Sequence, residues 1–96
     1  MLHILMNTPF RSDIELLKNS VSKKDDLIVI QDGVILAIKN NIFFKKTTLN
    51  TKKNYVLLND LYIRGIKIFN ISKMFLPINY KGFVILTEDH KKQLIW

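Results

Sequence analysis

The chain has 96 residues, of which 48% are apolar, and a formal net charge of +7. This length suits a single small domain, which we expect to span residues 1–96, and no apolar run approaches the roughly 18 residues of a membrane span. The chain has no cysteine, which excludes disulfides, thiolate metal sites and a cysteine nucleophile. Its first residues lack the basic flank and long apolar stretch of a signal peptide, so we expect a cytoplasmic protein.

The positive charge has two explanations. A strongly basic small domain suggests a nucleic-acid partner. However, 13 of the 15 basic residues are lysines, and lysine shares A/T-rich codons with the abundant isoleucine and asparagine, so we favour compositional bias. Lysine charge alone supports only non-specific binding. The lysines are scattered along the chain, notably as the pairs 23–24, 45–46, 52–53 and 91–92.

The first 26 residues predict a strand followed by a helix. Residues 2–6 are apolar apart from one histidine and end at an Asn-Thr-Pro sequence. Ser12 and Glu15 have the spacing of a capping box, which predicts the start of a helix. The residues that this helix would bury are Ile14, Leu17 and Val21, with Leu16 beside them. Residues 22–26 are polar and close the helix.

A second strand is predicted over Leu27–Ile30. Four apolar residues without a break are typical of a strand covered on both faces, as in a parallel sheet. Gln31 and Asp32 then interrupt the apolar run, and Gly33 opens a new pattern. This pattern has helical spacing and predicts a second helix that includes Val34, Ile35, Ile38 and Ile42. Residues 47–54 are polar and are expected to form a loop, the most disordered stretch of the chain.

The second half begins with a predicted third strand at residues 55–58. A short helix over residues 61–64 would follow and stop at Gly65, a residue type favoured just past helix ends. Residues 66–71 fit either a strand or an extended connector. A last strand is expected at residues 74–78, where Pro77 indicates an edge position.

The final predicted helix begins at Tyr80. Its apolar stripe consists of Phe83, Leu86, His90 and Leu94. Strands therefore alternate with helices along the chain. This order predicts a single small α/β domain with a mainly parallel sheet and helices on both faces.

Polar pairs follow each predicted strand, at the edge where open α/β sheets bind ligands. They are Asn7-Thr8, Gln31-Asp32, Asn59-Asp60 and Asn79-Tyr80. An aspartate at position 32 could act as a phosphoacceptor only beside an acidic pair after the first strand, and that place holds an amide and a hydroxyl. Gly33 stands alone, so a phosphate-binding glycine loop is not supported. We expect Asp32 and Gly33 to turn the chain and cap the second helix.

The two histidines fit structural roles better than metal binding. His3 lies in a buried-looking strand and His90 on an apolar stripe, and no acidic pair or cysteine accompanies either, so satisfied core or interface histidines are favoured. A triad of Ser12, His90 and Asp32 lacks the G-x-S-x-G elbow. Trp96 either docks onto its own sheet or anchors a subunit interface, where tryptophan is enriched.

Four groups of residues stand out together. They are Met1-Leu2-His3; the block Leu27–Val34; Asn59-Asp60 with Arg64-Gly65; and Tyr80, Phe83-Val84, Leu86, His90 and Trp96. In this order and at this length they resemble the TusB/DsrH family of sulfur-relay proteins. The resemblance covers essentially the whole chain, and the Gln-Asp-Gly block with the Met-Leu-His start carries most of it.

The resemblance implies a DsrE/F/H-type α/β fold and a hetero-oligomer with TusC-like and TusD-like subunits, a heterohexamer made of two heterotrimers. Such a complex takes persulfide sulfur from TusA and passes it towards TusE for 2-thiolation of the wobble uridine of certain tRNAs. The sulfur-carrying cysteine belongs to the TusD-type subunit in this family. Because a persulfide carrier needs a thiolate, a chain without cysteine is expected to be a non-catalytic, structural subunit.

The chain departs from the family pattern in two places. Members usually have Asp-Tyr where this chain has Asn79-Tyr80, so a charge-dependent role at that strand end is in doubt. Residues 66–75 align poorly, and no residue role is carried over there.

We therefore expect no catalytic residue, no cofactor and no bound metal. The residues proposed for sheet-edge shape, packing or a subunit interface are Gln31, Asp32, Gly33, Tyr80, Phe83, His90 and Trp96. The alternative function is a free-standing basic module that binds tRNA directly, and a small enzyme that uses Asp32 is a third possibility. Binding through lysines should weaken steeply as salt rises, whereas an apolar subunit interface should not.

Overall fold

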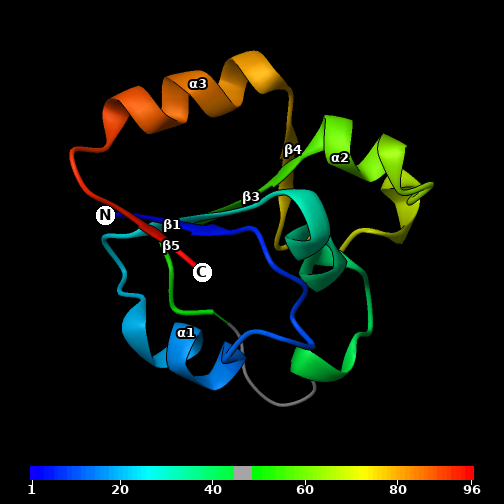
Figure 1. Cartoon of the computed structure of the whole chain (residues 1–96), viewed down its shortest axis with the longest axis horizontal. Helices are drawn as coiled ribbons and strands as arrows, with labels where there is room; N and C mark the ends of the chain where they lie inside the picture. Colours follow the sequence, from blue (N-terminus) through cyan, green and yellow to red (C-terminus); the bar gives the residue numbers. More distant parts are fainter. Residues whose placement is uncertain (45–48) are drawn as a thin grey trace.

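Five parallel strands form the centre of the fold, in the order β4-β3-β2-β1-β5 (Figure 1). The computed structural model describes residues 1–44 and 49–96. The strands are β1 (Leu2–Leu5), β2 (Asp26–Val29), β3 (Lys53–Leu57), β4 (Leu76–Ile78) and β5 (Gln93–Ile95). The predicted α/β class with a parallel sheet is confirmed.

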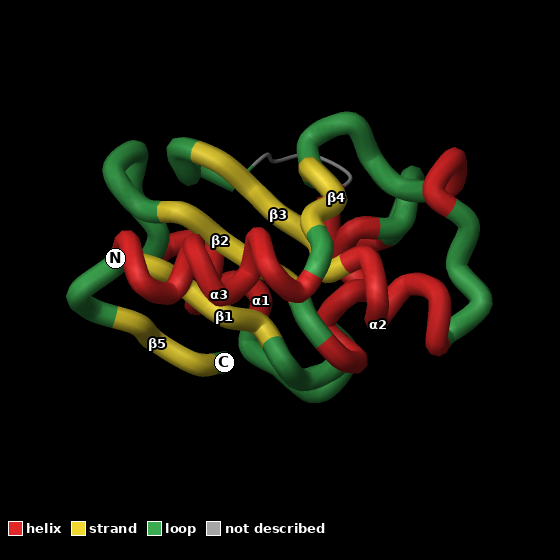
Figure 2. Tube along the Cα trace, turned by 90° about the horizontal axis from the view of Figure 1, so that it is seen from above, coloured by secondary structure: helices red, strands yellow, loops and turns green. Residues whose placement is uncertain are grey.

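Helices cover both faces of the sheet, as predicted. The helix α1 (Ile14–Ser20) lies against one face and α3 (Tyr80–Asp89) crosses the other (Figures 1 and 2). The helix α2 (Leu58–Ile63) follows β3 at the carboxyl end of the sheet. The described residues also include three 3₁₀ helices: η1 (Gln31–Ala37), η2 (Ile42–Phe44) and η3 (Ile68–Asn70).

Within the two described ranges, none of the helices has the length and apolar character needed to cross a membrane.

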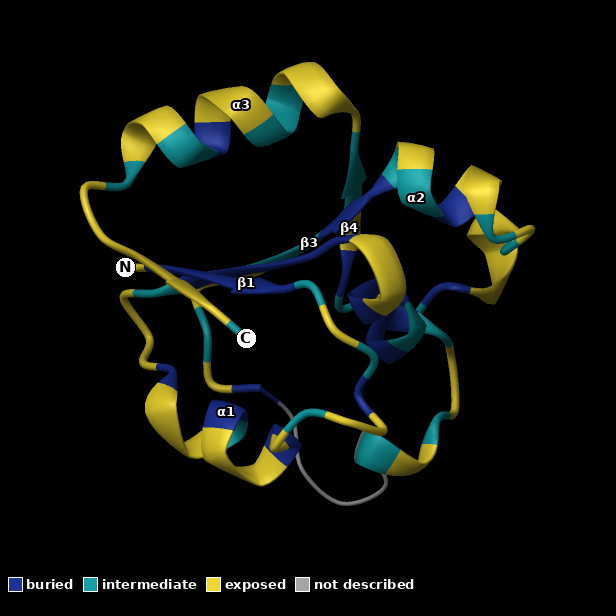
Figure 3. Ribbon diagram, in the orientation of Figure 1, coloured by how far each residue is buried: buried dark blue, intermediate teal, exposed yellow. Residues whose placement is uncertain are grey.

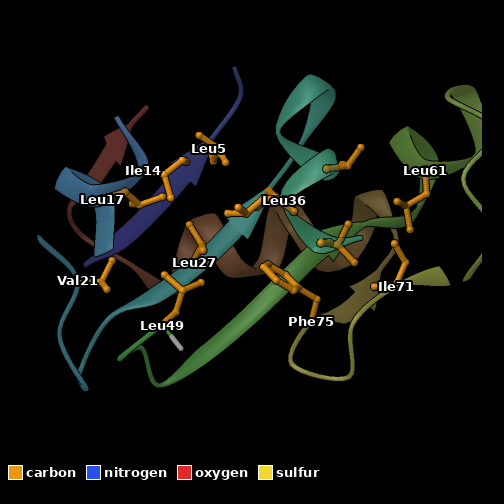
Figure 4. Packing of buried hydrophobic residues seen from close by; sticks show 14 residues of the cluster. Leu5, Ile14, Leu17, Val21, Leu27, Leu36, Leu49, Leu61, Ile71 and Phe75 are labelled. Atoms are coloured by element: carbon orange, nitrogen blue, oxygen red, sulfur yellow. The ribbon is translucent and has the colours of Figure 1, made fainter. Parts of the chain in front are cut away.

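The apolar run of β2 supplies two separate cores. Successive side chains of a strand point to opposite faces of the sheet. Leu27 and Val29 therefore join the larger cluster beneath α1 and η1 (Figure 4), whereas Ile28 joins the smaller cluster beneath α3. Both faces of the strand are buried, as Figure 3 shows for the central strands. This double burial explains why the run has no polar interruption.

The start of α1 differs from the capping-box prediction. Asp13 is the N-cap, and its carboxylate accepts the backbone N–H of Leu16 at 2.9 Å. The hydroxyl of Ser12 instead donates to the Thr8 carbonyl oxygen in the preceding turn. A carboxylate satisfies the first-turn N–H groups as well as a serine does and carries a charge that the helix N-terminus favours. Burial of the predicted stripe Ile14, Leu17 and Val21 is confirmed.

The second predicted helix is shorter and of a different type. The structure has the 3₁₀ helix η1, which begins directly after Ile30 and ends before Ile38. Ile38 then forms an isolated antiparallel bridge with Ile71. β-branched residues disfavour a longer α-helix here, and the bridge takes up the chain where the prediction continued the helix. The predicted capping of this helix by Asp32 is also wrong, because η1 has no side-chain cap.

The predicted loop at residues 47–54 extends too far, because its last two residues belong to β3. Residues 45–48 lie outside the described residues, but Leu49 is buried and β3 begins at Lys53. The short helix also begins earlier than predicted, because α2 follows β3 without a connecting residue. Its predicted end is confirmed by Gly65, which has a φ of +68°.

The last third contains one strand more than predicted. Residues 66–71 hold η3 rather than a strand, and α3 ends at Asp89, so His90 is its C-cap. Leu94 lies in β5, paired with β1, and not on the helix. Three exposed residues give too short an alternation to mark a strand in the sequence. The edge position predicted from Pro77 is confirmed, since β4 lies at one side of the sheet.

Gly33 allows η1 to begin directly against the end of β1. A Cβ atom at this position would lie 2.1 Å from the carbonyl oxygen of Leu5. That same oxygen accepts the N–H of Ile30 at 2.9 Å. A side chain would therefore push η1 away from the strand and weaken this bond.

We expect Gly33→Ala to lower the free energy of unfolding by about 3 kcal/mol, because overpacking against backbone cannot be relieved by a rotamer change. Urea denaturation measures this loss. Gly65→Ala is the comparison, since its Cβ would meet open space and only its positive φ is penalised, at about 1 kcal/mol. Equal losses in the two variants would contradict the close-approach argument.

Candidate functional site

The carboxyl end of the sheet gathers residues from two neighbouring strands. Gln31 follows β2 with a φ of +51°, a left-handed conformation that is unusual for a side-chain-bearing residue. Its backbone N–H donates to Oδ2 of Asp60 at 2.6 Å. Asp60 stands in the first turn of α2, directly after β3. The turn after β2 is thus held by a carboxylate that follows β3.

Arg64 completes this cluster from the C-cap of α2. Its Nε and Nη2 donate to Oδ1 of Asp32 at 3.2 and 3.0 Å, and its Nη1 lies 3.8 Å from Oδ1 of Asp60. The carboxylate of Asp32 is 66% exposed, so solvent screening keeps the energy of this pair small. The main effect is to hold the guanidinium in one orientation. We call Gln31, Asp32, Asp60 and Arg64 the carboxyl-edge cluster.

The chemistry of the carboxyl-edge cluster is that of positioning. Both carboxylates face the same guanidinium, so each of them helps to hold the Arg64 side chain in place. The cluster contains no thiol, hydroxyl or imidazole side chain. Among the described residues, no three His, Asp or Glu side chains come together in a way that would hold a metal ion.

The other two predicted polar pairs have local roles. Asn79 is the N-cap of α3, and its Oδ1 accepts the N–H of Gly82 at 2.9 Å. The carbonyl oxygen of Thr8 accepts hydrogen bonds from Arg11 and Ser12 in the turn before α1. These residues shape turns and caps.

A second polar network lies towards the amino end of the sheet and contains His3. This ring is 1% exposed. Its Nδ1 accepts the indole N–H of Trp96 at 3.2 Å, and its Nε2 lies 3.0 Å from Oδ2 of Asp25. Because an indole nitrogen only donates, neutral His3 carries its proton on Nε2 and donates it to Asp25. The prediction of a satisfied core histidine is confirmed for His3.

Trp96 docks back onto its own chain. Its backbone N–H donates to the Ile4 carbonyl oxygen, and its own carbonyl oxygen accepts the N–H of Met6. The indole remains partly exposed while it packs beside the larger core. The side chain is therefore held in place with part of its surface open to solvent.

His90 forms the matching pair on the other face of the sheet. Its Nε2 lies 2.9 Å from Oδ2 of Asp26, at the start of β2. The second carboxylate oxygen of Asp26 is buried and has no hydrogen-bond partner among the described residues. Burial and the negative charge of Asp26 raise the pKa of Tyr55 above its usual value.

The remaining predicted residues, Tyr80 and Phe83, stand together on α3. Their rings meet edge to face, with centroids 6.2 Å apart. Phe83 is half-buried against the smaller core, and Tyr80 is exposed. The seven predicted residues therefore occupy three places: the carboxyl edge, the start of α3 and the histidine networks.

Sequence reasoning did not assign roles to Asp25, Asp60 and Arg64. Asp60 had a signal, because it follows a predicted strand just as Asp32 does. Arg64 belongs to a group that carries the family resemblance, but nothing in the sequence pairs Arg64 with Asp32 or Asp25 with His3, since these partners lie 32 and 22 residues away. Such pairings depend on the strand order.

The carboxyl group of Asp25 makes the stability of the fold depend on pH in the acid range. Burial raises the pKa of this carboxyl group, but hydrogen bonds from His3, the Met1 ammonium and the Ser22 N–H, with the ammonium charge, outweigh burial and leave the pKa below its usual 3.8. A lowered folded-state pKa contributes stability above the unfolded value, and this contribution is lost as pH falls through the folded value.

We expect Asp25→Asn to cost about 1–2 kcal/mol at pH 7 and to lose less further stability than the unmutated protein between pH 5 and pH 2. Chemical denaturation across this range measures both effects. Asp89→Asn, which removes an exposed carboxylate, is the control and should leave the acid profile nearly unchanged. An unchanged profile in the Asp25 variant would show that this group does not drive acid destabilisation.

Comparisons with known proteins find relatives along the whole chain. The family model described as DsrH like protein matches residues 7–93. The chain is 46% identical to Protein TusB of Buchnera aphidicola subsp. Acyrthosiphon pisum (strain 5A) and 38% identical to Protein TusB of Shigella dysenteriae serotype 1, over 96 residues that make up 100% of each chain.

Two solved structures share the fold. The solution NMR structure of protein Tm0979 from Thermotoga maritima has a TM-score of 0.68 at 24% identity, covering 96% of this chain and 97% of that one. Protein MTH1491 from Methanobacterium thermoautotrophicum, of unknown function, has a TM-score of 0.71 at 12% identity, covering 99% and 97%. The full-length relatives and the matched family model together show that the chain belongs to the DsrH/TusB family.

Proposed function

We propose that this chain is a structural subunit of a TusBCD-type sulfur-transfer complex and does not itself carry sulfur. Membership of the DsrH/TusB family supports a role in tRNA sulfur relay. The observation that carries the proposal is the absence of cysteine from all 96 residues. A persulfide forms on a thiolate, so the sulfur has to pass through a partner.

In the proposed complex the chain packs against a TusC-like subunit and thereby supports a TusD-like subunit. Two such heterotrimers form a heterohexamer in the cytoplasm. The TusD-like subunit supplies the cysteine that takes persulfide sulfur from TusA and passes it towards TusE, for 2-thiolation of the wobble uridine of tRNA. This chain acts there through its shape and surface, without a cofactor.

One apolar surface fits the contact with the TusC-like subunit. It lies beyond the carboxyl end of β3, where α2 is followed after a short connection by η3 (Figures 1 and 2). Its exposed large apolar residues are Tyr62, Ile63, Ile68 and Phe69, and we call them the α2–η3 surface. The side chains of Ile63 and Phe69 are 77% and 70% exposed. Such exposure on a small domain marks an interaction site.

The carboxyl-edge cluster gives this surface a fixed polar neighbour. Arg64 follows Ile63 directly, and its guanidinium is already oriented by Asp32 and Asp60. Arginine and tyrosine are enriched among the residues that dominate binding energy. A side chain ordered before binding loses less entropy on association. This supports a role for Gln31, Asp32 and Gly33 in shaping the edge that a partner meets.

The other predicted interface residues have smaller roles in the proposed contact. Tyr80 and Phe83 present an aromatic pair at the start of α3, and His90 and Trp96 are held by pairs within the chain. We propose that Tyr80 extends the contact area and that Phe83, His90 and Trp96 keep the supporting elements in place.

Co-expression with the TusC-like and TusD-like chains of the same organism tests the proposal. We expect a complex of all three chains that survives high salt, because an apolar interface is little affected by screening. Ile63→Glu should weaken assembly at least about thirtyfold, as expected for a buried anchor. Light scattering at low and high salt measures both results.

Leu16→Glu is the matched control, because it places the same charge on an exposed apolar position of α1. This variant should assemble normally. A chain that stays monomeric beside both partners would contradict the proposed function. Normal assembly of the Ile63 variant would contradict only the choice of surface.

The alternative is a free-standing module that binds tRNA directly. It is favoured by the exposure of the lysine pairs 23–24, 52–53 and 91–92. Enzymatic use of Asp32 finds less support, because this carboxylate is exposed and held by Arg64. Asp32→Asn should leave sulfur transfer by the assembled complex unchanged.

A further inference from the structure

Three lysine pairs that are far apart in the sequence lie at the same end of the sheet. Residues 23–24 lie in the turn before β2, residues 52–53 lead into β3, and residues 91–92 lie just before β5. All the strands are parallel, so these entry points share the amino edge (Figure 2). The fold therefore converts scattered charge into a single basic edge, which we call the lysine edge.

The six ammonium groups of the lysine edge are free to meet a ligand. All six residues are exposed. In the described part of the chain, none of them forms a salt bridge. The nearby carboxylates of Asp25 and Asp26 are instead committed to the Met1 ammonium, His3 and His90. The Met1 ammonium offsets the charge of the partly buried Asp25, whereas the charge of Asp26 counts against the lysines.

Two exposed acids reduce the positive charge of the lysine edge without cancelling it. Glu88 and Asp89 end α3, whose last turn reaches the same end of the molecule (Figure 2). When Asp25, Asp26 and the Met1 ammonium are counted as well, the edge keeps an excess of three positive charges. The lysines extend across β3, β2, β1 and β5, or about 14 Å at the usual strand spacing. The pairs before β2 and β3 are only one strand spacing apart, about 5 Å, and reinforce one another because the Debye length in cells is about 8 Å.

We propose that the lysine edge binds the phosphate backbone of RNA. Lysine is depleted at protein–protein interfaces, and the most exposed apolar anchors, Ile63 and Phe69, lie at the opposite end of the sheet. Flexible ammonium groups in a row, without apolar anchors of that kind, suit a chain of phosphates that is contacted regardless of sequence. The choice of RNA as the polyanion rests on the proposed role in tRNA thiolation.

This arrangement separates two functions on opposite ends of the sheet. The α2–η3 surface and the carboxyl-edge cluster serve a protein partner at the carboxyl end. The lysine edge faces away from them and stays accessible when that partner is bound. A subunit with no thiol would then still take part in the reaction, by holding the tRNA backbone near the assembly.

The test compares two triple variants with the same net charge. The edge variant Lys24→Gln, Lys52→Gln and Lys92→Gln removes one charge from each pair. The control variant Lys39→Gln, Lys67→Gln and Lys81→Gln removes three exposed charges elsewhere, after η1, before η3 and in the first turn of α3. Binding of the full-length chain to an unmodified tRNA transcript is titrated at salt concentrations from 50 to 200 mM, with circular dichroism to verify folding.

We expect the edge variant to bind tRNA at least about tenfold more weakly at 50 mM salt and to reduce the slope of log K against log salt by about 2 to 3. The control variant should retain the original slope to within about 1. Equal losses in both variants would overturn the proposal, because they would show that binding depends on net charge alone and not on the position of the lysines. Tighter binding to a duplex DNA of equal length would overturn the assignment to RNA.

The outcome for the protein partners is read separately. If the edge variant binds tRNA normally but no longer joins the TusC-like and TusD-like chains, the edge meets an acidic protein and the proposal is wrong. If the original chain fails to assemble yet shows the expected tRNA slope, the proposed subunit role fails and the lysine edge stands as an RNA-binding site.

Discussion

The close approach between Gly33 and the end of β1 sets the geometry of the carboxyl end of this protein. With no side chain at position 33, η1 starts one residue after Ile30, directly against the Leu5 carbonyl group. The chain has to turn at once, so Gln31 takes a left-handed conformation and offers its N–H to Asp60. A hydrogen bond to a charged acceptor offsets part of the strain of such a residue. The Gln-Asp-Gly block is therefore explained by backbone packing.

Much of the architecture was predictable because burial leaves a direct trace in the sequence. The unbroken run of β2 predicted a central parallel strand, and its residues alternate between the two cores as the class requires. Gly65 and Pro77 marked a helix end and an edge strand through their backbone chemistry. In each case the residue type at one position is enough to indicate the local structure there.

The failures have physical causes as well. β5 exists because β1 has an unpaired side that residues 93–95 can cover, and nothing within those three exposed residues announces it. The N-cap shifted from Ser12 to Asp13 because neighbouring polar residues compete for the same N–H groups. Arg64 and its carboxylates meet only once β2 and β3 are adjacent. The lysine edge also depends on strand order, which composition alone cannot reveal.

The pairing of β5 with β1 also bears on how the fold opens. It joins residues about 90 positions apart, and closing so long a loop carries a large entropic cost. The strand has three exposed side chains and is held by its backbone pairing with β1, by the bond from the Leu2 N–H to the Lys92 carbonyl oxygen, and by the hydrogen bonds of Trp96 to Ile4, Met6 and His3. Segments with so few buried contacts open at free energies below that of global unfolding. Detachment of β5 would leave one edge of β1 unpaired while the buried residues of both cores, none of which lies in β5, stay in place.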